Sequence, residues 1–234
     1  MRLKKWEQLP PAMQTEAVRG YYDVLKKKRW SLFCKRVFDI AVSLLLLLLL
    51  SPLFLILAVA IRLDSRGPVF YRQVRVTQYG REFRIFKFRS MVQDADRGSL
   101  VTVQGDARVT RVGRVIRRCR LDEISQLLNV LRGDMTFVGT RPEVPKYVAQ
   151  YSPAMLATLL LPAGITSLAS ILYKDEAKLL DAAEDTDRVY VEQVLPGKME
   201  YNLKALKDCG FWKDIRFMVL TVLAVLGIGN GSDK

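Results

Sequence analysis

A long apolar run, SLLLLLLLSPLFLILAVAIR at Ser43–Arg62, constrains this chain more than any other feature. No residue from Ile40 to Ile61 is charged, and a helix of this length, rising about 1.5 Å per residue, matches a hydrocarbon core of about 30 Å. A charged N-terminal segment comes first, whereas a secretory signal would begin near the N-terminus and be shorter. We therefore interpret the run as a membrane anchor.

The composition of the run and of its flanks bears on how it enters a membrane. Ser51 and Pro52 lie near its middle, where a proline bends a helix and a serine hydroxyl can satisfy a freed carbonyl. Basic residues, which favour the cytoplasmic side, flank both ends: Lys26, Lys27, Lys28, Arg29, Lys35 and Arg36 before the run, and Arg62, Arg66, Arg72 and Arg75 after it. The residues alone leave two alternatives: a re-entrant helical hairpin over residues 40–61 with both ends cytoplasmic, or a spanning helix with a proline kink.

The overall composition narrows the function classes. A net charge of +13 favours an anionic neighbour, such as lipid headgroups, nucleic acid or phosphorylated substrates. The chain has no histidine, which excludes His-based triads, imidazole bases and His-containing zinc sites. Cys34, Cys119 and Cys209 are odd in number and far apart, which indicates a reducing compartment and not a disulfide framework.

Residue patterns outside the run predict a mainly α-helical chain with a small β-hairpin. Residues 1–30 are charged, with aromatic clusters, as in an interfacial helical arm. The segments GPVFYRQVRV and REFRIFKFRSM alternate apolar and basic residues around a turn at Tyr79-Gly80. An apolar stretch after Arg216 is too short to span a membrane and predicts an interfacial or core helix.

Leucines and isoleucines at helical spacing predict one helix from Thr110 to Arg132, ended by Gly133, and a second helix is predicted over residues 143–161. On the first helix, Asp122 falls nearly opposite the leucine stripe, with Glu123 at its flank. Arg118 comes four residues before Asp122. This pattern alone is typical of a solvated helix face with an i,i+4 ion pair.

The segment RLDEISQLLNVLRGDMTFVGTRPE, however, resembles the core of the bacterial sugar transferases, the monotopic polyprenyl-phosphate phosphoglycosyl transferases. Further segments follow in the family's order over roughly residues 35–227: KRVFDI, the Ser51-Pro52 break, GPVFYRQVR, FKFRSM, NVLRGDM, VGTRP and DIRFMVLTVLAVL. Single segments of this set are weak signals, but the ordered set is specific.

The resemblance implies transfer of phosphosugar from a UDP-sugar to undecaprenyl phosphate, with release of UMP, as the first membrane step of glycoconjugate synthesis. It implies a monotopic membrane protein with a broken re-entrant helix and interfacial amphipathic helices, at the cytoplasmic face of the bacterial inner membrane. The expected divisions are an interfacial arm (1–34), the re-entrant helix (35–62), a cytoplasmic catalytic domain (63–229) and a tail (230–234). We expect little more than a catalytic module, with anionic lipids as neighbours.

The resemblance also implies roles for particular residues. Asp122 is the expected nucleophile, which forms a covalent phosphosugar intermediate. Mg²⁺ is the expected cofactor, with Asp122 and Glu123 as its carboxylates, although Glu123 has the alternative role of orienting the carrier phosphate. The expected phosphate-binding cations are Lys87, Arg117 and Arg141. Arg89 and Arg118 have two alternatives, headgroup contacts or surface ion pairs.

Some positions depart from the family's pattern. Ile124-Ser125 stands where Leu-Pro is common, Thr140 where proline is usual before Arg141, and Thr77 where glycine is common, and LPAGITSLAS replaces the usual Pro-Gly-Ile-Thr-Gly. None removes a residue with an assigned role, so these departures bear on the substrate more than on the reaction. The sugar, the glycan pathway and the oligomeric state, a homo-oligomer included, are left open.

Two rival functions use the same basic charge. A polybasic membrane scaffold would explain the charge and the anchor, but not the joint occurrence of the transferase motifs. Nucleic-acid binding is suggested only by the charge and by FRIFKFR, and such electrostatic binding would weaken steeply with salt. We therefore expect an enzyme that does not bind nucleic acid.

Overall fold

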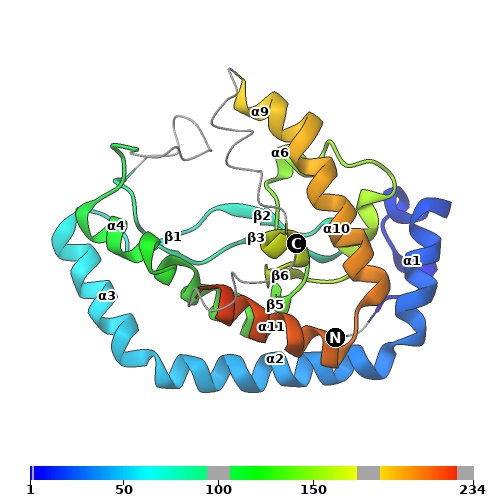
Figure 1. Ribbon diagram of the computed structural model, residues 1–234, viewed down its shortest axis with the longest axis horizontal. Coiled ribbons are helices and arrows are strands. Elements are labelled where there is room, and N and C mark those ends of the chain that lie inside the picture. The colour runs from blue at the N-terminus through cyan, green and yellow to red at the C-terminus, as the bar shows by residue number, and fades with distance from the viewer. Residues whose placement is uncertain (2, 94–105, 173–184, 226–234) are drawn as a thin grey trace, which may run out of the picture.

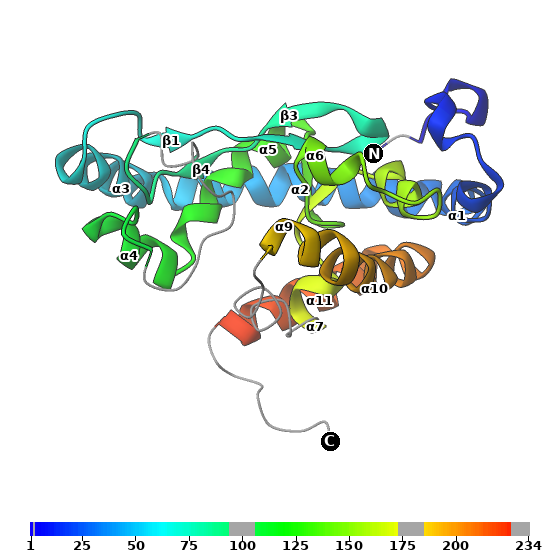
Figure 2. The ribbon, with the colours of Figure 1, turned by 90° about the horizontal axis from the view of Figure 1, so that it is seen from above.

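The computed structural model describes residues 1, 3–93, 106–172 and 185–225. A bent pair of helices, α2 (Arg29–Leu49) and α3 (Ser51–Asp64), runs along one side of the molecule, and the remaining elements lie above it in Figure 1. In the view of Figure 2, the strands β1 to β4 lie on one side of this pair and the helices α7, α10 and α11 on the other. The predicted tail, 230–234, lies outside the described residues.

The break in the apolar run is at the predicted position. Pro52 lies in the first turn of α3, where its missing N–H needs no partner, and the Ser51 hydroxyl donates to the Leu48 carbonyl at 2.8 Å. The helix axis changes direction by 62°. In the part of the chain that the structure describes, no single helix has the length and hydropathy to cross a membrane, whereas α2 and α3 together do.

The predicted break separates two helices that meet at Leu50. The Leu50 N–H donates to the Leu46 carbonyl at the end of α2, and the Phe54 N–H donates to the Leu50 carbonyl at the start of α3. The two helices thus form a wide elbow, a bend that both a re-entrant segment and a broken span would show.

Polar side chains on the first half of α2 attach it to the rest of the protein. Asp39 is 1% exposed and accepts hydrogen bonds from the Thr136 hydroxyl at 2.7 Å and the Phe137 N–H at 3.3 Å. Lys35 donates to the Val138 carbonyl at 2.8 Å. Arg36 donates to the carbonyls of Val130 and Leu131 at the end of α5 (Leu127–Arg132), where a helix leaves carbonyls short of partners.

The N-terminal arm packs on the protein. It contains two short 3-10 helices, η1 (Trp6–Gln8) and η2 (Pro11–Met13), followed by α1 (Glu16–Lys27). The apolar face of α1 is buried, with Val18 and Leu25 fully inaccessible to solvent. It belongs to the same apolar cluster as the 3-10 helix η6 (Met155–Leu160). The arm therefore completes one end of the core.

The predicted β-hairpin is confirmed. β2 (Val74–Val76) pairs antiparallel with β3 (Glu82–Arg84), and β1 (Phe70–Tyr71) pairs antiparallel with β4 (Lys87–Phe88). The chain reverses through η3 (Gln78–Gly80), where Tyr79 and Gly80 have φ values of 61° and 75°. A glycine takes this left-handed conformation at no steric cost, which explains the turn.

The predicted helix from Thr110 to Arg132 is wrong in its continuity. Its ends are confirmed: the Thr110 hydroxyl accepts from the Gly113 N–H at 3.0 Å, and Gly133 has a φ of 85°. Between them the chain forms α4 (Arg111–Arg118), the 3-10 helix η5 (Leu121–Gln126) and α5. Arg120 has a φ of 56°, and this left-handed residue breaks the helical register.

The predicted helix over 143–161 is also interrupted, into α6 (Pro145–Val148) and η6. Pro145 and Pro153 explain the breaks, because a residue before proline disfavours helical geometry. These two segments lie between the strands of a parallel pair that the sequence did not predict, β5 (Met135–Val138) and β6 (Ala163–Thr166).

The C-terminal helices complete the fold as α7 (Leu168–Leu172), α9 (Thr186–Val189), the π-helical turn η7 (Tyr190–Val194), α10 (Leu195–Asp208) and α11 (Phe211–Val225). The helix α11, predicted as an interfacial or core helix, packs against α2. Asp214 pairs with Lys35, and the rings of Phe211 and Phe38 lie 5.7 Å apart. Trp212 remains 78% exposed.

Candidate active site

The two carboxylates singled out from the sequence lie on η5, between α4 and α5. The side chains of Asp122 and Glu123 are only 15% and 17% exposed. They therefore do not lie on a solvated helix face, and that interpretation of the pattern is wrong. Its physical reason is the left-handed Arg120, which removes the helical relation between Arg118 and Asp122.

Two of the predicted cations reach this pair from other elements. Lys87, on β4, places its Nζ 3.4 Å from Glu123 Oε1 and 4.0 Å from Asp122 Oδ2. Arg141, in the loop after β5, donates from both terminal guanidinium nitrogens to the two carboxylate oxygens of Glu123. Such a paired geometry fixes both groups more firmly than a single contact would.

The surroundings give the two carboxylates different electrostatics. Burial raises the pKa of Asp122, an effect that Lys87 opposes and the neighbouring Glu123 charge reinforces. Burial also disfavours the charge of Glu123, but Arg141 and Lys87 outweigh it and lower the pKa of Glu123 to about 2. Glu123 is thus a fixed anion that holds two cations, whereas the fork of Arg141 leaves Asp122 unengaged.

The third predicted cation, Arg117, lies in the last turn of α4. Its charge favours the ionised form of Asp122. Within the described residues, one of its terminal nitrogens is buried and has no hydrogen-bond partner. A buried donor without a partner costs about 1–3 kcal/mol, and an anionic acceptor beside it would remove that cost.

The other two arginines considered from the sequence do not join this group. Arg89 is 5% exposed and donates to the carbonyls of Arg66 and Ser65 at 2.8 and 2.6 Å, which caps the end of α3. It therefore serves neither as a headgroup contact nor as a surface ion pair. Arg118 is exposed at the end of α4.

Sequence reasoning missed the residues that hold the Arg141 loop. Arg75 on β2 donates to the Pro142 carbonyl at 3.0 Å and lies 4.0 Å from Glu143 Oε2. The Tyr190 hydroxyl donates to Glu143 Oε1 at 2.6 Å, and this links the loop to η7. The alternation of Val74, Arg75 and Val76 could have predicted that the Arg75 side chain lies on the polar face of β2. It could not have predicted that Arg75 contacts the Arg141 loop.

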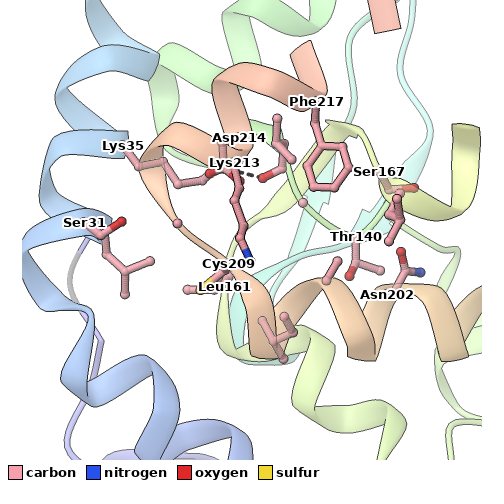
Figure 3. A pocket seen from close by; sticks show the side chains of 17 residues that line it. Ser31, Lys35, Thr140, Leu161, Ser167, Asn202, Cys209, Lys213, Asp214 and Phe217 are labelled. Atoms are coloured by element: carbon pink, nitrogen blue, oxygen red, sulfur yellow. Dashed lines mark hydrogen bonds and ion pairs between the residues drawn. The ribbon is translucent and has the colours of Figure 1, made fainter. Parts of the chain in front are cut away.

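A separate pocket lies between α2, α10 and α11 (Figure 3). Its cavity volume is about 50 Å³, and the Lys35–Asp214 ion pair lines it. Thr140 also lines it. Adjacent residues of one loop, Thr140 and Arg141, thus contribute to this pocket and to the candidate active site.

The site combines a pair of carboxylates, Asp122 and Glu123, with surrounding cations and a bent helix pair. Comparison with known protein families identifies the class of protein that has these features. Residues 30–227 match the family described as bacterial sugar transferase. This match covers most of the chain, so the chain belongs to the bacterial sugar transferase family. The resemblance seen in the ordered motifs is confirmed.

Curated relatives carry related activities in their names. The chain is 37% identical over 198 residues to the UDP-N-acetylgalactosamine-undecaprenyl-phosphate N-acetylgalactosaminephosphotransferase of Aeromonas hydrophila, covering 83% of this chain and 44% of that protein. It is 36% identical over 193 residues to the UDP-glucose:undecaprenyl-phosphate glucose-1-phosphate transferase of Klebsiella pneumoniae, covering 80% of this chain and 39% of that protein.

A protein of the same name from Caulobacter vibrioides is 36% identical over 200 residues, which cover 84% of this chain and 71% of that protein. The chain thus spans less than half the length of the first two relatives and most of the third. The relatives are named for different sugars, so their names do not agree on one donor.

Proposed function

We propose that this protein transfers phosphosugar from a UDP-sugar to undecaprenyl phosphate through a covalent intermediate on Asp122. The observation that carries the proposal is the cluster at η5. In this cluster the Asp122 carboxylate, which Arg141 does not contact, lies beside the Glu123 carboxylate, which Arg141 and Lys87 hold in place. Lys87, Arg141 and Arg117 are the surrounding cations. Such fixed cations stabilise the charge of a transferred phosphoryl group.

The proposed reaction has two steps at the phosphorus next to the sugar. A carboxylate oxygen of Asp122 attacks this phosphorus, and the bond to the bridging oxygen breaks, so UMP leaves with the electron pair. A phosphate oxygen of undecaprenyl phosphate then attacks the same phosphorus. The bond to Asp122 breaks, and the carboxylate is restored.

Glu123 has a supporting part in this mechanism. Its carboxylate holds Lys87 at 3.4 Å and the fork of Arg141, which keeps two cations beside Asp122. Mobile lysine and arginine side chains would lose conformational entropy on binding phosphate. Because Glu123 already orders both side chains in the folded protein, much of this entropy is lost on folding and not on binding.

The donor set suits Mg²⁺. Among the described residues, no group of three or more Cys, Asp and Glu side chains comes together. Mg²⁺ commonly binds through one or two carboxylates, with substrate phosphates and water completing its shell. Because the oxygens of Glu123 accept from Arg141, Asp122 is the carboxylate that would hold the ion, with Glu123 beside it. The ion would neutralise diphosphate charge, and the protein's own residues would supply the nucleophile and the fixed cations.

The elbow of α2 and α3 supports a re-entrant position in the bacterial inner membrane, with both ends cytoplasmic. Large apolar side chains remain exposed along both arms, as a lipid-facing surface requires: Phe33, Val37, Ile40, Leu44, Leu45, Leu48, Leu49, Leu55, Ile56, Val59 and Leu63. Trp30 and Trp212 are also exposed, and tryptophan favours the headgroup level.

The activity is tested with the purified full chain, undecaprenyl phosphate, Mg²⁺ and a panel of UDP-sugars, by measuring UMP. We expect release of UMP and a lipid-linked phosphosugar with at least one donor. Excess EDTA should stop the reaction, and added Mg²⁺ should restore it. UMP release that persists in EDTA would contradict the metal assignment, and no release with any donor would contradict the proposed function.

The topology is tested with single cysteines at the exposed positions Lys5 and Glu82, in a chain whose three native cysteines are replaced. In intact cells, an impermeant maleimide should label neither position. Replacing Ser51 and Pro52 by Leu and Ala should straighten the elbow and expose the cysteine at position 5. Labelling at position 5 in the chain that retains Ser51 and Pro52 would mean that the run spans the membrane.

A further inference from the structure

The backbone of Phe86, the residue directly before Lys87, has unusual partners. Phe86 lies between β3 and β4. Its N–H donates to Asn129 Oδ1 at 2.8 Å, and its carbonyl accepts from the Ser125 hydroxyl at 3.1 Å. Both side chains are fully inaccessible to solvent. Two buried side chains thus satisfy the backbone groups that a neighbouring strand would otherwise satisfy.

Both side chains come from the segment that carries the candidate catalytic carboxylates. Ser125 lies on η5, and its hydroxyl is also 3.3 Å from the carbonyl oxygen of Asp122. Asn129 lies on α5 and donates from Nδ2 to the Arg84 carbonyl at 3.1 Å. The strand region before Lys87 is therefore attached to the η5–α5 segment at the backbone of two residues, Arg84 and Phe86.

We propose that Ser125 and Asn129 are positioning residues for the transfer reaction, which hold the backbone before Lys87 so that its ammonium faces both carboxylates. This inference rests on the proposed function. A lysine side chain is a flexible stem, so its Nζ stays between Asp122 and Glu123 only if its backbone is fixed relative to η5. Neither positioning residue needs to touch a substrate.

This attachment depends on the identity of residue 125. A proline or an alanine there would have no hydroxyl that can donate to the Phe86 carbonyl. Here the serine supplies a hydrogen bond that links η5 to the Lys87 strand, and the adjoining Asn129 supplies the second link.

The test uses Ser125→Ala, which removes one oxygen without adding volume, in the full chain. We expect kcat for UMP release to fall about tenfold, with a smaller change in KM and a fall in Tm no larger than that caused by removing another buried hydroxyl. In a Lys87→Met background the same substitution should change kcat by less than about twofold, because the group it positions is gone. Asn129→Ala should show the same dependence on Lys87.

A matched control is Thr158→Val, which removes another buried hydroxyl, one that donates to the Met155 carbonyl at 2.7 Å. Its effect on kcat should be small and equal in both backgrounds. Equal losses for Ser125→Ala with and without Lys87 would overturn the inference, as would a loss explained by a lower Tm.

Hydrogen exchange decides the question for any variant with too little turnover to measure. Ser125→Ala should speed amide exchange in the segment 84–88, and unchanged exchange there would overturn the inference. This readout needs no activity, so a wild-type chain that releases no UMP would contradict the proposed function and leave the positioning test intact.

Discussion

Asp122→Asn is expected to abolish UMP release, because an amide is a poor nucleophile and cannot form the covalent intermediate. The change keeps the size of the side chain, so the protein should stay folded. Incubation of the wild-type chain with a UDP-sugar and no acceptor should give a phosphosugar adduct, visible by intact-protein mass spectrometry. The variant should give none.

The control is Asp23→Asn on α1, where the side chain is 49% exposed and pairs with Arg19. It should leave both turnover and adduct formation unchanged. Full UMP release by Asp122→Asn would remove this residue from the chemical step. An adduct that maps to another side chain would identify a different nucleophile.

Arg141→Ala has the second largest expected effect. It removes a guanidinium that contacts Glu123 and that we propose binds the transferred phosphoryl group, so kcat/KM should fall by about 10²-fold or more. Arg141→Lys should recover only part of this loss, because lysine keeps the charge but lacks the two-nitrogen fork. Steady-state kinetics of UMP release measure both effects.

Arg81→Ala is the matched control, because Arg81 also pairs with a carboxylate, that of Asp134 at 2.8 Å, but lies on the hairpin with 56% of its side chain exposed. Its loss should leave kcat/KM nearly unchanged. Unchanged kinetics in Arg141→Ala would transfer the phosphate-binding role to Lys87 or Arg117.

Features set by short-range chemistry could be predicted from the sequence. Pro52 marks the break in the apolar run, Thr110 and Gly133 mark the ends of a helical region, and Tyr79-Gly80 marks the hairpin. In each case one or a few adjacent residues restrict the backbone. The extent of the bend, 62°, could not be predicted, because a proline marks where a helix breaks but does not fix the angle between its two parts.

Features set by distant partners could not be predicted. The left-handed Arg120 interrupts a pattern that reads as one helix, and nothing in its side chain favours that conformation. The parallel pairing of β5 and β6 joins segments separated by α6 and η6. Likewise, the meeting of Lys87, Arg141 and Glu123 was expected only through the resemblance, since each comes from a different element.

The attachment of α2 to the rest of the protein has a consequence for where the reaction takes place. Lys35, Arg36 and Asp39 bond to β5 and to the end of α5, the two elements that flank the dyad and the Arg141 loop. If the elbow is embedded as proposed, the carboxylates of Asp122 and Glu123 cannot move along the membrane normal or tilt independently of it. The depth of α2 in the membrane then fixes the distance of these carboxylates from the lipid surface. They can contact a carrier phosphate only at that distance.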